Sequence, residues 1–516
     1  MKPPSGTGAL LEQTAGGAGW TIGWRAATRA LGFISTLVLA RVLVPADFGI
    51  VALAISFSRA VDILADLGLE DAIIRATAPS RAFYDTAFTV NVLRGLSTAV
   101  IISAAALPFA TFFDDPRLTY VVLAFAGAVL LDALENIGVA DFRRHFAFRS
   151  EFQLSIFPRI AQVVVTITLA LIWRNYWALV AGILTSRVLR VASSYIMHPF
   201  RPRLSLQAWR ELSGFSFWTW LISMVRMIRG RSVIMTIGRM LSPALLGVYT
   251  LGAEIATMPE SELIDPLCRV CFASFSAARR AGISVAETYL RIIASTWLIA
   301  LPASIGISSV AAPLVVLAFG SKWIEATPVV QIMALAGVFG VMGRISSTLF
   351  SAFTYFRSQI IILVAMAVIQ LSLLVFCVWH WGIPGAAVAM AVTVLLEQAI
   401  YSVLAFHAFK IPPSHLIGQI WRCMIAAGSM AAVLGMTGLG WTSGTAPEGS
   451  NAIHLLSACA TGAAVYGVVL LGLWLACGRP NGPEADVLEL LKRIGSRLIL
   501  AVARRTAFMR PAGSGQ

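Results

Sequence analysis

Arginine and carboxylate side chains interrupt stretches of the sequence that are otherwise apolar. Arg25 and Arg29 stand four residues apart, so a helix presents both on one face. A guanidinium group binds phosphate or carboxylate through paired hydrogen bonds, and a cluster of such groups predicts an anion-binding site. The next apolar stretches carry Arg59, Asp62, Asp66 and Arg94.

The same pattern recurs in the second half of the sequence, where Arg226, Arg229 and Arg231 precede Glu254. A charge at the centre of a bilayer costs about 3 kcal/mol on insertion scales, so these groups must face water or each other. We predict that the substrate-binding residues are Arg25, Arg29, Arg59, Arg94, Arg226 and Arg229. We predict that Asp62, Asp66 or Glu254 takes part in cation coupling.

Two other interpretations stay open for these charges. The early arginines can serve as structural partners of Asp62 and Asp66. Asp132, Glu135, Arg187 and Arg190 stand near the expected ends of their helices, where charged side chains reach the interface.

The elements that position these charges are membrane-spanning helices. The chain has 516 residues, of which 58% are hydrophobic and 12% charged, against roughly a quarter charged in soluble domains. A bilayer core requires about 20 mostly apolar residues per helix. An all-α polytopic fold of about fourteen helices is expected, near residues 20–43, 48–69, 86–113, 118–139, 152–173, 177–198, 214–240, 245–268, 293–319, 327–350, 356–379, 383–407, 417–440 and 453–476.

Loop charges predict the orientation of these spans. With the N-terminus in the cytoplasm, most loop Lys and Arg residues lie inside, as the positive-inside rule requires. The net charge of +14 therefore does not indicate nucleic-acid binding. Indole rings favour the interface, and the predicted outer rim carries Trp173, Trp177, Trp323, Trp379, Trp381 and Trp441. We predict a multi-pass protein of the bacterial inner membrane with both termini cytoplasmic and with membrane lipids as partners.

A repeat suggests the arrangement of the helices. Residues 40–51 (ARVLVPADFGIV) align without gaps to residues 238–249 (GRMLSPALLGVY), and each copy joins the first two helices of a six-helix set. Repeated lobes are typical of transporters. We predict lobes at residues 1–205 and 206–412, an added helix pair at 413–478, and a basic amphipathic tail at 479–516 that rests on the anionic leaflet.

Signatures of enzymes and metal sites are missing from the sequence. It holds no phosphate-binding loop, HExxH, GxSxG or GxGxxG motif. Cys268 and Cys271 have CxxC spacing, but no second pair completes a tetrahedral metal site. We therefore expect a protein that is not an enzyme and has no cofactor and no metal.

Several stretches resemble the polysaccharide transporter family (Wzx-like) of the multidrug/oligosaccharidyl-lipid/polysaccharide exporter superfamily. The similar stretches include ARVLVPADFGIVALA at 40–54, FRRHFAFR at 142–149, GRMLSPALLGVYTLGAEIATMP at 238–259 and GSKWIEATPVVQIMAL at 320–335. The resemblance covers about residues 20–410. It is greatest to flippases and exporters of exopolysaccharide or lipopolysaccharide precursors.

This resemblance implies two six-helix bundles in a V and alternating access. It implies movement of an undecaprenyl-pyrophosphate-linked oligosaccharide, or another anionic glycan, from the cytoplasmic to the periplasmic side. Polysaccharide polymerase or export machinery is the expected protein partner. The chain departs from many relatives at residues 226–239, RMIRGRSVIMTIGR, where arginines replace amide and carboxylate residues.

Two other functions compete with a flippase. A small-molecule antiporter of the same superfamily requires an apolar, acidic cavity for cationic drugs, whereas the cavity expected here is basic. A membrane-embedded glycosyltransferase or polymerase requires a carboxylate base or a large outer loop, and every predicted outer loop is short.

Overall fold

The computed structural model describes residues 27–65, 68–76, 79–145, 147–209, 217–260, 271, 274–275, 281–282, 284–352, 356–442, 448–480 and 482–485. Within these residues the chain is helical, with connecting turns and no strand. Arg25, Asp66 and most of the predicted amphipathic tail lie outside the described residues.

Helices correspond to all fourteen predicted spans. The first helix covers residues 27–42. It is followed by α2 (Pro45–Leu64), α3 (Leu69–Arg75), α4 (Arg81–Phe112), α5 (Arg117–Ala133), η1 (Ile137–Val139), α6 (Ala140–Arg144), α7 (Phe148–Trp173), α8 (Trp177–Met197), α10 (Phe217–Met240), α11 (Pro243–Ala256), α13 (Val285–Ser309), α14 (Ala311–Phe319), η3 (Ser321–Ala326), α15 (Thr327–Ala352), α16 (Phe356–Phe409), α17 (Pro413–Met436) and α18 (Glu448–Ala476).

Many of these helices are long and apolar enough to cross a bilayer. Among the described residues eight helices meet that requirement, and a ninth span results if Arg117–Ala133 and Ile137–Arg144, bent by 63°, form one crossing. The protein is therefore a multi-pass membrane protein with an all-helical fold. The count of fourteen stays a prediction, because charged helices such as α2 and α10 fall below this apolarity.

The longest helix, α16, contains two of the predicted spans. Its backbone leaves the helical region at Gly382, where φ is 59° and ψ is −133°. Such a conformation is open to glycine and unfavourable for residues with a side chain. Gly382 therefore ends one helical segment and allows the next to begin, close to the predicted boundary between residues 379 and 383.

The chain divides into two compact units. The first comprises Met1–Leu251, Ala318–Ala326 and Leu363–Ala386, and the second comprises Gly252–Leu317, Thr327–Ile362 and Ala387–Gln516. Each unit takes in segments from distant parts of the sequence. The lobe boundaries that the sequence suggested stay a prediction.

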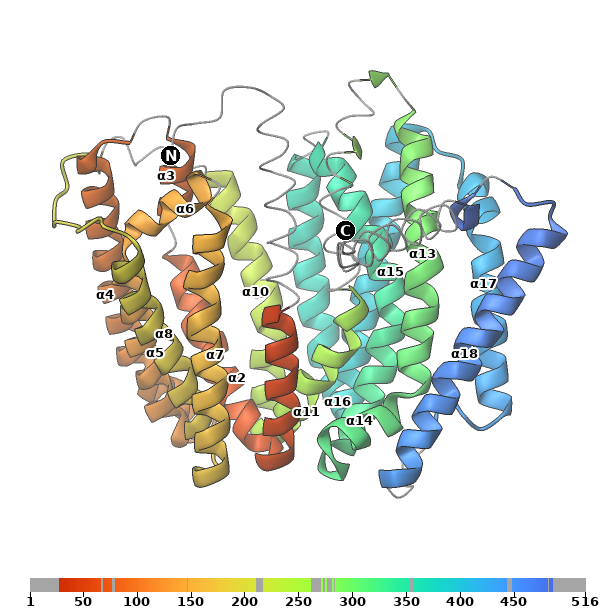
Figure 1. Ribbon diagram of the computed structural model, residues 1–516, viewed down its shortest axis with the longest axis horizontal. Helices are drawn as coiled ribbons and strands as arrows, with labels where there is room; N and C mark the ends of the chain where they lie inside the picture. Colours follow the sequence, from red (N-terminus) through yellow and green to blue (C-terminus); the bar gives the residue numbers. More distant parts are fainter. Residues whose placement is uncertain are drawn as a thin grey trace, which may run out of the picture. The chain divides into compact units, whose positions relative to one another are not determined.

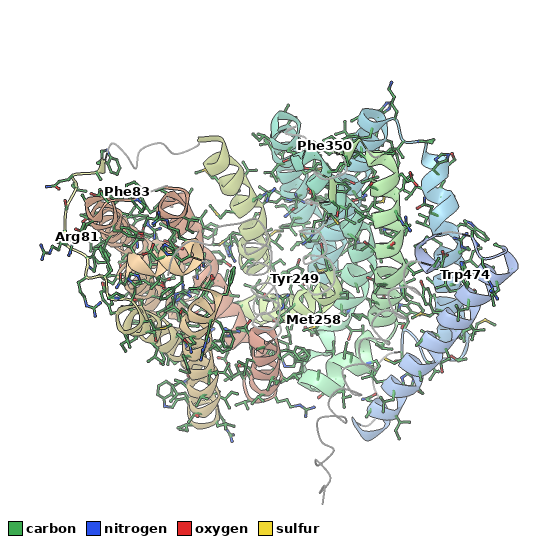
Figure 2. All side chains as sticks on the ribbon, turned by 45° about the horizontal axis from the view of Figure 1, so that its top comes forward. Arg81, Phe83, Tyr249, Met258, Phe350 and Trp474 are labelled. Atoms are coloured by element: carbon green, nitrogen blue, oxygen red, sulfur yellow. The ribbon has the colours of Figure 1, made fainter. Side chains whose placement is uncertain are left out.

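In the first unit, α4 packs on α5, α7 packs on α8, and α2 and α8 both contact α5 (Figure 1). Helix α4 begins where the Ser80 hydroxyl accepts a hydrogen bond from the Phe83 backbone N–H at 3.2 Å, a typical N-cap. Arg81 lies at the edge of the unit, whereas the side chain of Phe83 is buried (Figure 2). This bundle positions the polar residues described below.

In the second unit, α13 packs against α15 and α17, and α17 packs on α18. The Tyr466 hydroxyl of α18 donates a hydrogen bond to the Leu298 carbonyl oxygen of α13 at 2.7 Å. Arg422 of α17 forms a buried two-bond ion pair with Glu484, just after α18, at 2.7 and 3.0 Å. These contacts hold the last two described helices to the second unit.

The two copies of the repeat adopt the same local structure. Each copy ends one helix and begins the next with its proline, Pro45 at the start of α2 and Pro243 at the start of α11. Proline suits the first turn of a helix, because its ring fixes φ and the N–H groups there lack helical partners. The prediction that each copy joins two successive helices therefore agrees with the structure.

Candidate functional site

A cavity of about 350 Å³ lies inside the first unit, among α2, α5, α7 and α8. Its wall contains apolar residues and a group of polar side chains that converge from all four helices. The polar lining residues are Ser58 and Arg59 of α2, Asp132 of α5, Ser155, Arg159 and Gln162 of α7, and Ser186, Arg187 and Arg190 of α8.

Arg187 and Asp132 face each other in the wall of this cavity. The Arg187 NH1 atom lies 3.0 Å from Asp132 Oδ1, and each side chain is about a quarter exposed. Arg187 is ten residues from either end of α8 (Trp177–Met197). The interpretation that Arg187 lies at an interface near a helix end is therefore wrong, because its guanidinium group faces the cavity from the middle of its helix.

Arg190 lies one helical turn beyond Arg187 and pairs with Glu135. The Arg190 Nε atom donates a hydrogen bond to Glu135 Oε2 at 2.8 Å. The Arg190 side chain is 31% exposed and the Glu135 side chain 14%, so the pair is only partly buried. Arg190 therefore both lines the cavity and joins α8 to the segment that follows α5.

Arg159, which is not among the residues predicted from the sequence, enters the cavity from α7. Its NH1 atom donates a hydrogen bond to Gln162 Oε1 at 3.1 Å. Its NH2 atom lies against the first helix, where a Cβ atom on Gly32 would come within 2.8 Å of it. The absence of a side chain at Gly32 leaves room for this guanidinium group.

Asp62 lies between two of the predicted arginines. Arg94 NH1 lies 2.8 Å from Asp62 Oδ1, and Arg59 NH1 lies 3.8 Å from Asp62 Oδ2. Arg94 also donates through Nε to Asn91 Oδ1 at 3.3 Å. Three predicted residues therefore form one cluster, and Arg59 connects this cluster to the cavity.

The other predicted site residues stand on the first helix, on α10 and on α11. Arg29 is exposed on the first helix, Arg226 is exposed on α10, and Glu254 is exposed on α11. Arg229 Nε donates a hydrogen bond to Gln370 Oε1 at 2.6 Å, and Gln370 Nε2 donates to the Arg229 carbonyl oxygen at 3.1 Å. The roles proposed for these four residues stay predictions.

The charges near the cavity do not balance. Five arginines, Arg59, Arg94, Arg159, Arg187 and Arg190, meet three carboxylates, Asp62, Asp132 and Glu135. Among these eight described side chains the arginines outnumber the carboxylates by two, and the low dielectric of a membrane protein strengthens the attraction of such a group for an anion. The geometry suits binding of a phosphate, diphosphate or carboxylate group.

In the part of the chain that is described, no three His, Cys, Asp or Glu side chains form a group suited to a metal ion.

Comparison with protein families identifies a family for this chain. Residues 38–328, more than half of the chain, match the family described as "Polysaccharide biosynthesis protein". This segment contains the whole cavity and both copies of the repeat.

Individual relatives extend this similarity over most of the chain. The succinoglycan biosynthesis transport protein ExoT of Rhizobium meliloti is 24% identical over 88% of this chain and 92% of its own length. The lipopolysaccharide biosynthesis protein WzxC of Escherichia coli is 21% identical over 80% of this chain and 83% of its own length.

Solved structures share the fold. The lipid II flippase MurJ, in an inward closed conformation, superposes with a TM-score of 0.73 at 13% identity, covering 89% of this chain and 99% of its own. An inward-facing multidrug transporter of the MATE family superposes with a TM-score of 0.60 at 13% identity, covering 74% of this chain and 94% of its own.

Proposed function

Because the chain belongs to the polysaccharide biosynthesis protein family, we propose that it is a flippase for a lipid-linked oligosaccharide or polysaccharide precursor. It would move this substrate from the cytoplasmic to the periplasmic side of the bacterial inner membrane by alternating access. The product would feed exopolysaccharide or lipopolysaccharide synthesis.

The cavity among α2, α5, α7 and α8 is the observation that carries this proposal. Four arginines line it within a bundle of membrane helices, which is costly unless an anion or water occupies the space. An undecaprenyl pyrophosphate group carries charges that such arginines neutralise, and an acidic glycan would do so as well. A drug antiporter for organic cations would require the opposite charge.

The relatives support the same class of substrate. ExoT is named for transport in succinoglycan biosynthesis, and WzxC is named for lipopolysaccharide biosynthesis. Transport of one precursor across the membrane also implies that a polymerase or export complex receives it. We extend these properties to this chain as part of the proposal, together with cytoplasmic placement of both termini.

Deletion of the gene tests this function. We expect lipid-linked sugars to accumulate on the cytoplasmic leaflet, where a membrane-impermeant reagent fails to label them in intact spheroplasts. Wild-type protein should restore labelling, and Arg187→Gln with Arg59→Gln should not.

Arg117→Gln provides the control for this rescue. Arg117 pairs with Asp115 at 2.8 Å, away from the cavity at the other end of α5, and its loss should leave transport intact. Normal polysaccharide and normal labelling in the deletion strain would contradict the proposed function.

A further inference from the structure

The Arg187–Asp132 pair differs from a structural ion pair in its surroundings. Both side chains line a cavity large enough for several non-hydrogen atoms, and each keeps about a quarter of its surface exposed there. The buried Arg422–Glu484 pair, by contrast, makes two hydrogen bonds and is less than a tenth exposed on either side. Arg187 is therefore accessible to a competing anion.

Ser58 supplies an independent indication of a ligand. Its side chain is 97% buried and lines the same cavity, and its hydroxyl group has no hydrogen-bond partner among the described residues. Buried hydroxyl groups without a partner are uncommon and each requires an explanation. The oxygen atom itself is closed off from the cavity in this structure, so a rotation of the Ser58 side chain would be needed to turn its hydroxyl group toward an oxyanion there.

The donors around the cavity match an oxyanion. Arg59, Arg159 and Arg187 come from three different helices, so they can approach one ligand from separate directions. Gln162 holds Arg159 by accepting its hydrogen bond. A diphosphate offers enough oxygen atoms for several guanidinium groups, and its size is compatible with a volume of about 350 Å³.

We propose that this cavity is a diphosphate-binding site and that Asp132 is a built-in competitor which holds Arg187 until the ligand displaces it. The inference rests on the proposed function only for the origin of the diphosphate, which is the linkage group of the transported lipid. Arg59, Arg159 and Arg187 bind the ligand, and Ser58 donates a hydrogen bond to it. The carboxylate of Asp132 keeps Arg187 neutralised when the site is empty.

This arrangement predicts that a substitution of Asp132 and a substitution of Arg187 change the affinity for pyrophosphate in opposite directions. Asp132→Asn removes the competitor and adds one positive charge, so binding of inorganic pyrophosphate should tighten several-fold. Arg187→Gln removes a charged donor and should weaken binding about tenfold or more. A purely structural pair predicts weaker binding for both variants, because either loss disturbs the same bundle.

The measurement is a calorimetric titration of full-length protein in lipid nanodiscs with inorganic pyrophosphate. Asp115→Asn is the matched control, since Asp115 pairs with Arg117 near the start of α5, about 25 Å of helix away from Asp132. It should leave affinity unchanged. Arg187→Lys, which keeps the charge and loses the planar fork, should weaken binding by an intermediate factor, and size-exclusion profiles establish that each variant is folded.

A second arm adds undecaprenyl pyrophosphate to the nanodiscs. Competition with inorganic pyrophosphate identifies the lipid-linked group as a ligand, whereas a lack of competition assigns the site to free diphosphate. Unchanged or weaker binding in Asp132→Asn overturns the competitor role, and no binding in wild type overturns the site. If the cavity variants transport normally and bind pyrophosphate like wild type, this inference alone is refuted. If the deletion strain makes normal polysaccharide, the proposed function is refuted.

Discussion

Gly49 and Gly247, which hold the same position in the two copies of the repeat, each lie against the backbone of the other copy. A Cβ atom on Gly49 would come within 1.7 Å of the Pro243 carbonyl oxygen, and one on Gly247 within 2.0 Å of the Pro45 carbonyl oxygen. The contact is therefore reciprocal. The matched positions in the sequence correspond to a symmetric crossing of α2 and α11.

Replacing either glycine should destabilise this crossing. Gly49→Ala and Gly247→Ala each force a methyl group onto a backbone carbonyl, and overpacking of this kind costs about 1–3 kcal/mol. We expect a lower midpoint of thermal unfolding for both variants in detergent. Gly127→Ala in α5, where nothing lies within 4 Å of the added atom, should match or exceed wild type, because alanine favours a helix. Equal midpoints for all three variants would contradict the crossing.

A second prediction concerns the Asp62–Arg94 pair. It tests whether the pair contributes to the free energy of unfolding, as a structural role requires. Both side chains are about 15% exposed, and Asp62 keeps Arg59 as a second partner, so losing one member of the pair should cost about 1–3 kcal/mol. Asp62→Asn combined with Arg94→Gln removes both charges and should cost less than the sum of the single changes. A double-mutant cycle on unfolding free energies measures this coupling. Strictly additive effects would show that the two groups do not interact in the folded protein.

The fold was largely predictable because each membrane-spanning helix is a continuous run of mostly apolar residues, whose length can be counted in the sequence. Each of the fourteen predicted spans overlaps a helix, since about 20 apolar residues suffice to identify a crossing. The ends of α13 were less accurate: the prediction began at residue 293, whereas the helix begins at Val285. Its first turns are polar, with Ser284 as N-cap and Glu287 in the first turn, so apolarity alone missed them.

The site was predictable only in part, because packing between distant helices decides which charges meet. Arg59, Asp62 and Arg94 were expected together and lie together. Arg159 was missed, although its position in apolar α7, four residues after Ser155, placed both on one helical face. Trp323 was expected to face the interface at the outer rim, but its ring is completely buried within the protein and does not reach the interface. Its level in the membrane stays a prediction.

Helix α10 carries several arginines, and the structure accounts for one of them. Gln370 is 1% exposed and exchanges two hydrogen bonds with Arg229, one with its side chain and one with its backbone. No property of residues 226–239 alone identifies a partner 141 positions away. Such pairings depend on tertiary structure.

His198 makes a prediction about pH. It follows α8, and its Nδ1 atom accepts a hydrogen bond from the Phe200 backbone N–H at 3.2 Å, which requires an unprotonated nitrogen. Burial lowers the pKa of His198, Asp141 opposes this effect, and the positive charges of Arg201 and His145 add to it. The folded state therefore binds fewer protons than the unfolded state, and stability should fall as pH drops below the ordinary His pKa of about 6.5.

Thermal unfolding between pH 5 and pH 8 measures this dependence. His198→Asn is the informative variant, because its side-chain oxygen can accept the same kind of hydrogen bond and does not titrate in this range. The variant should show a smaller loss of stability toward pH 5 than wild type. A wild-type midpoint that rises as pH falls through 6.5 would contradict the sign of the His198 contribution.

Lys322 and Trp323 make the last prediction, which concerns the end of the first helix. Trp323 Nε1 donates a hydrogen bond to the Ala40 carbonyl oxygen at 2.8 Å, and Lys322 Nζ donates to the Arg41 and Leu43 carbonyl oxygens at 3.0 and 2.6 Å. The last carbonyl groups of a helix lack helical partners, and a cation is favourable beside them. These two side chains of η3 therefore cap a helix almost 280 residues earlier in the chain.

Trp323→Phe should keep an aromatic contact with Phe48, whose ring centroid lies 5.3 Å away. It loses the hydrogen bond and also leaves a small cavity, because the fully buried indole is larger than a phenyl ring. We expect a loss of about 1–3 kcal/mol for Trp323→Phe, from the hydrogen bond and the cavity together. For Lys322→Met we expect a loss of about 1.5–3 kcal/mol, because hydrogen bonds from charged donors are strong. Trp379→Phe, at a side chain that is 78% exposed, is the matched control and should unfold like wild type. If all three variants unfold alike, η3 does not stabilise the first helix; if Lys322→Met alone unfolds early, the charge beside the helix end outweighs the indole hydrogen bond.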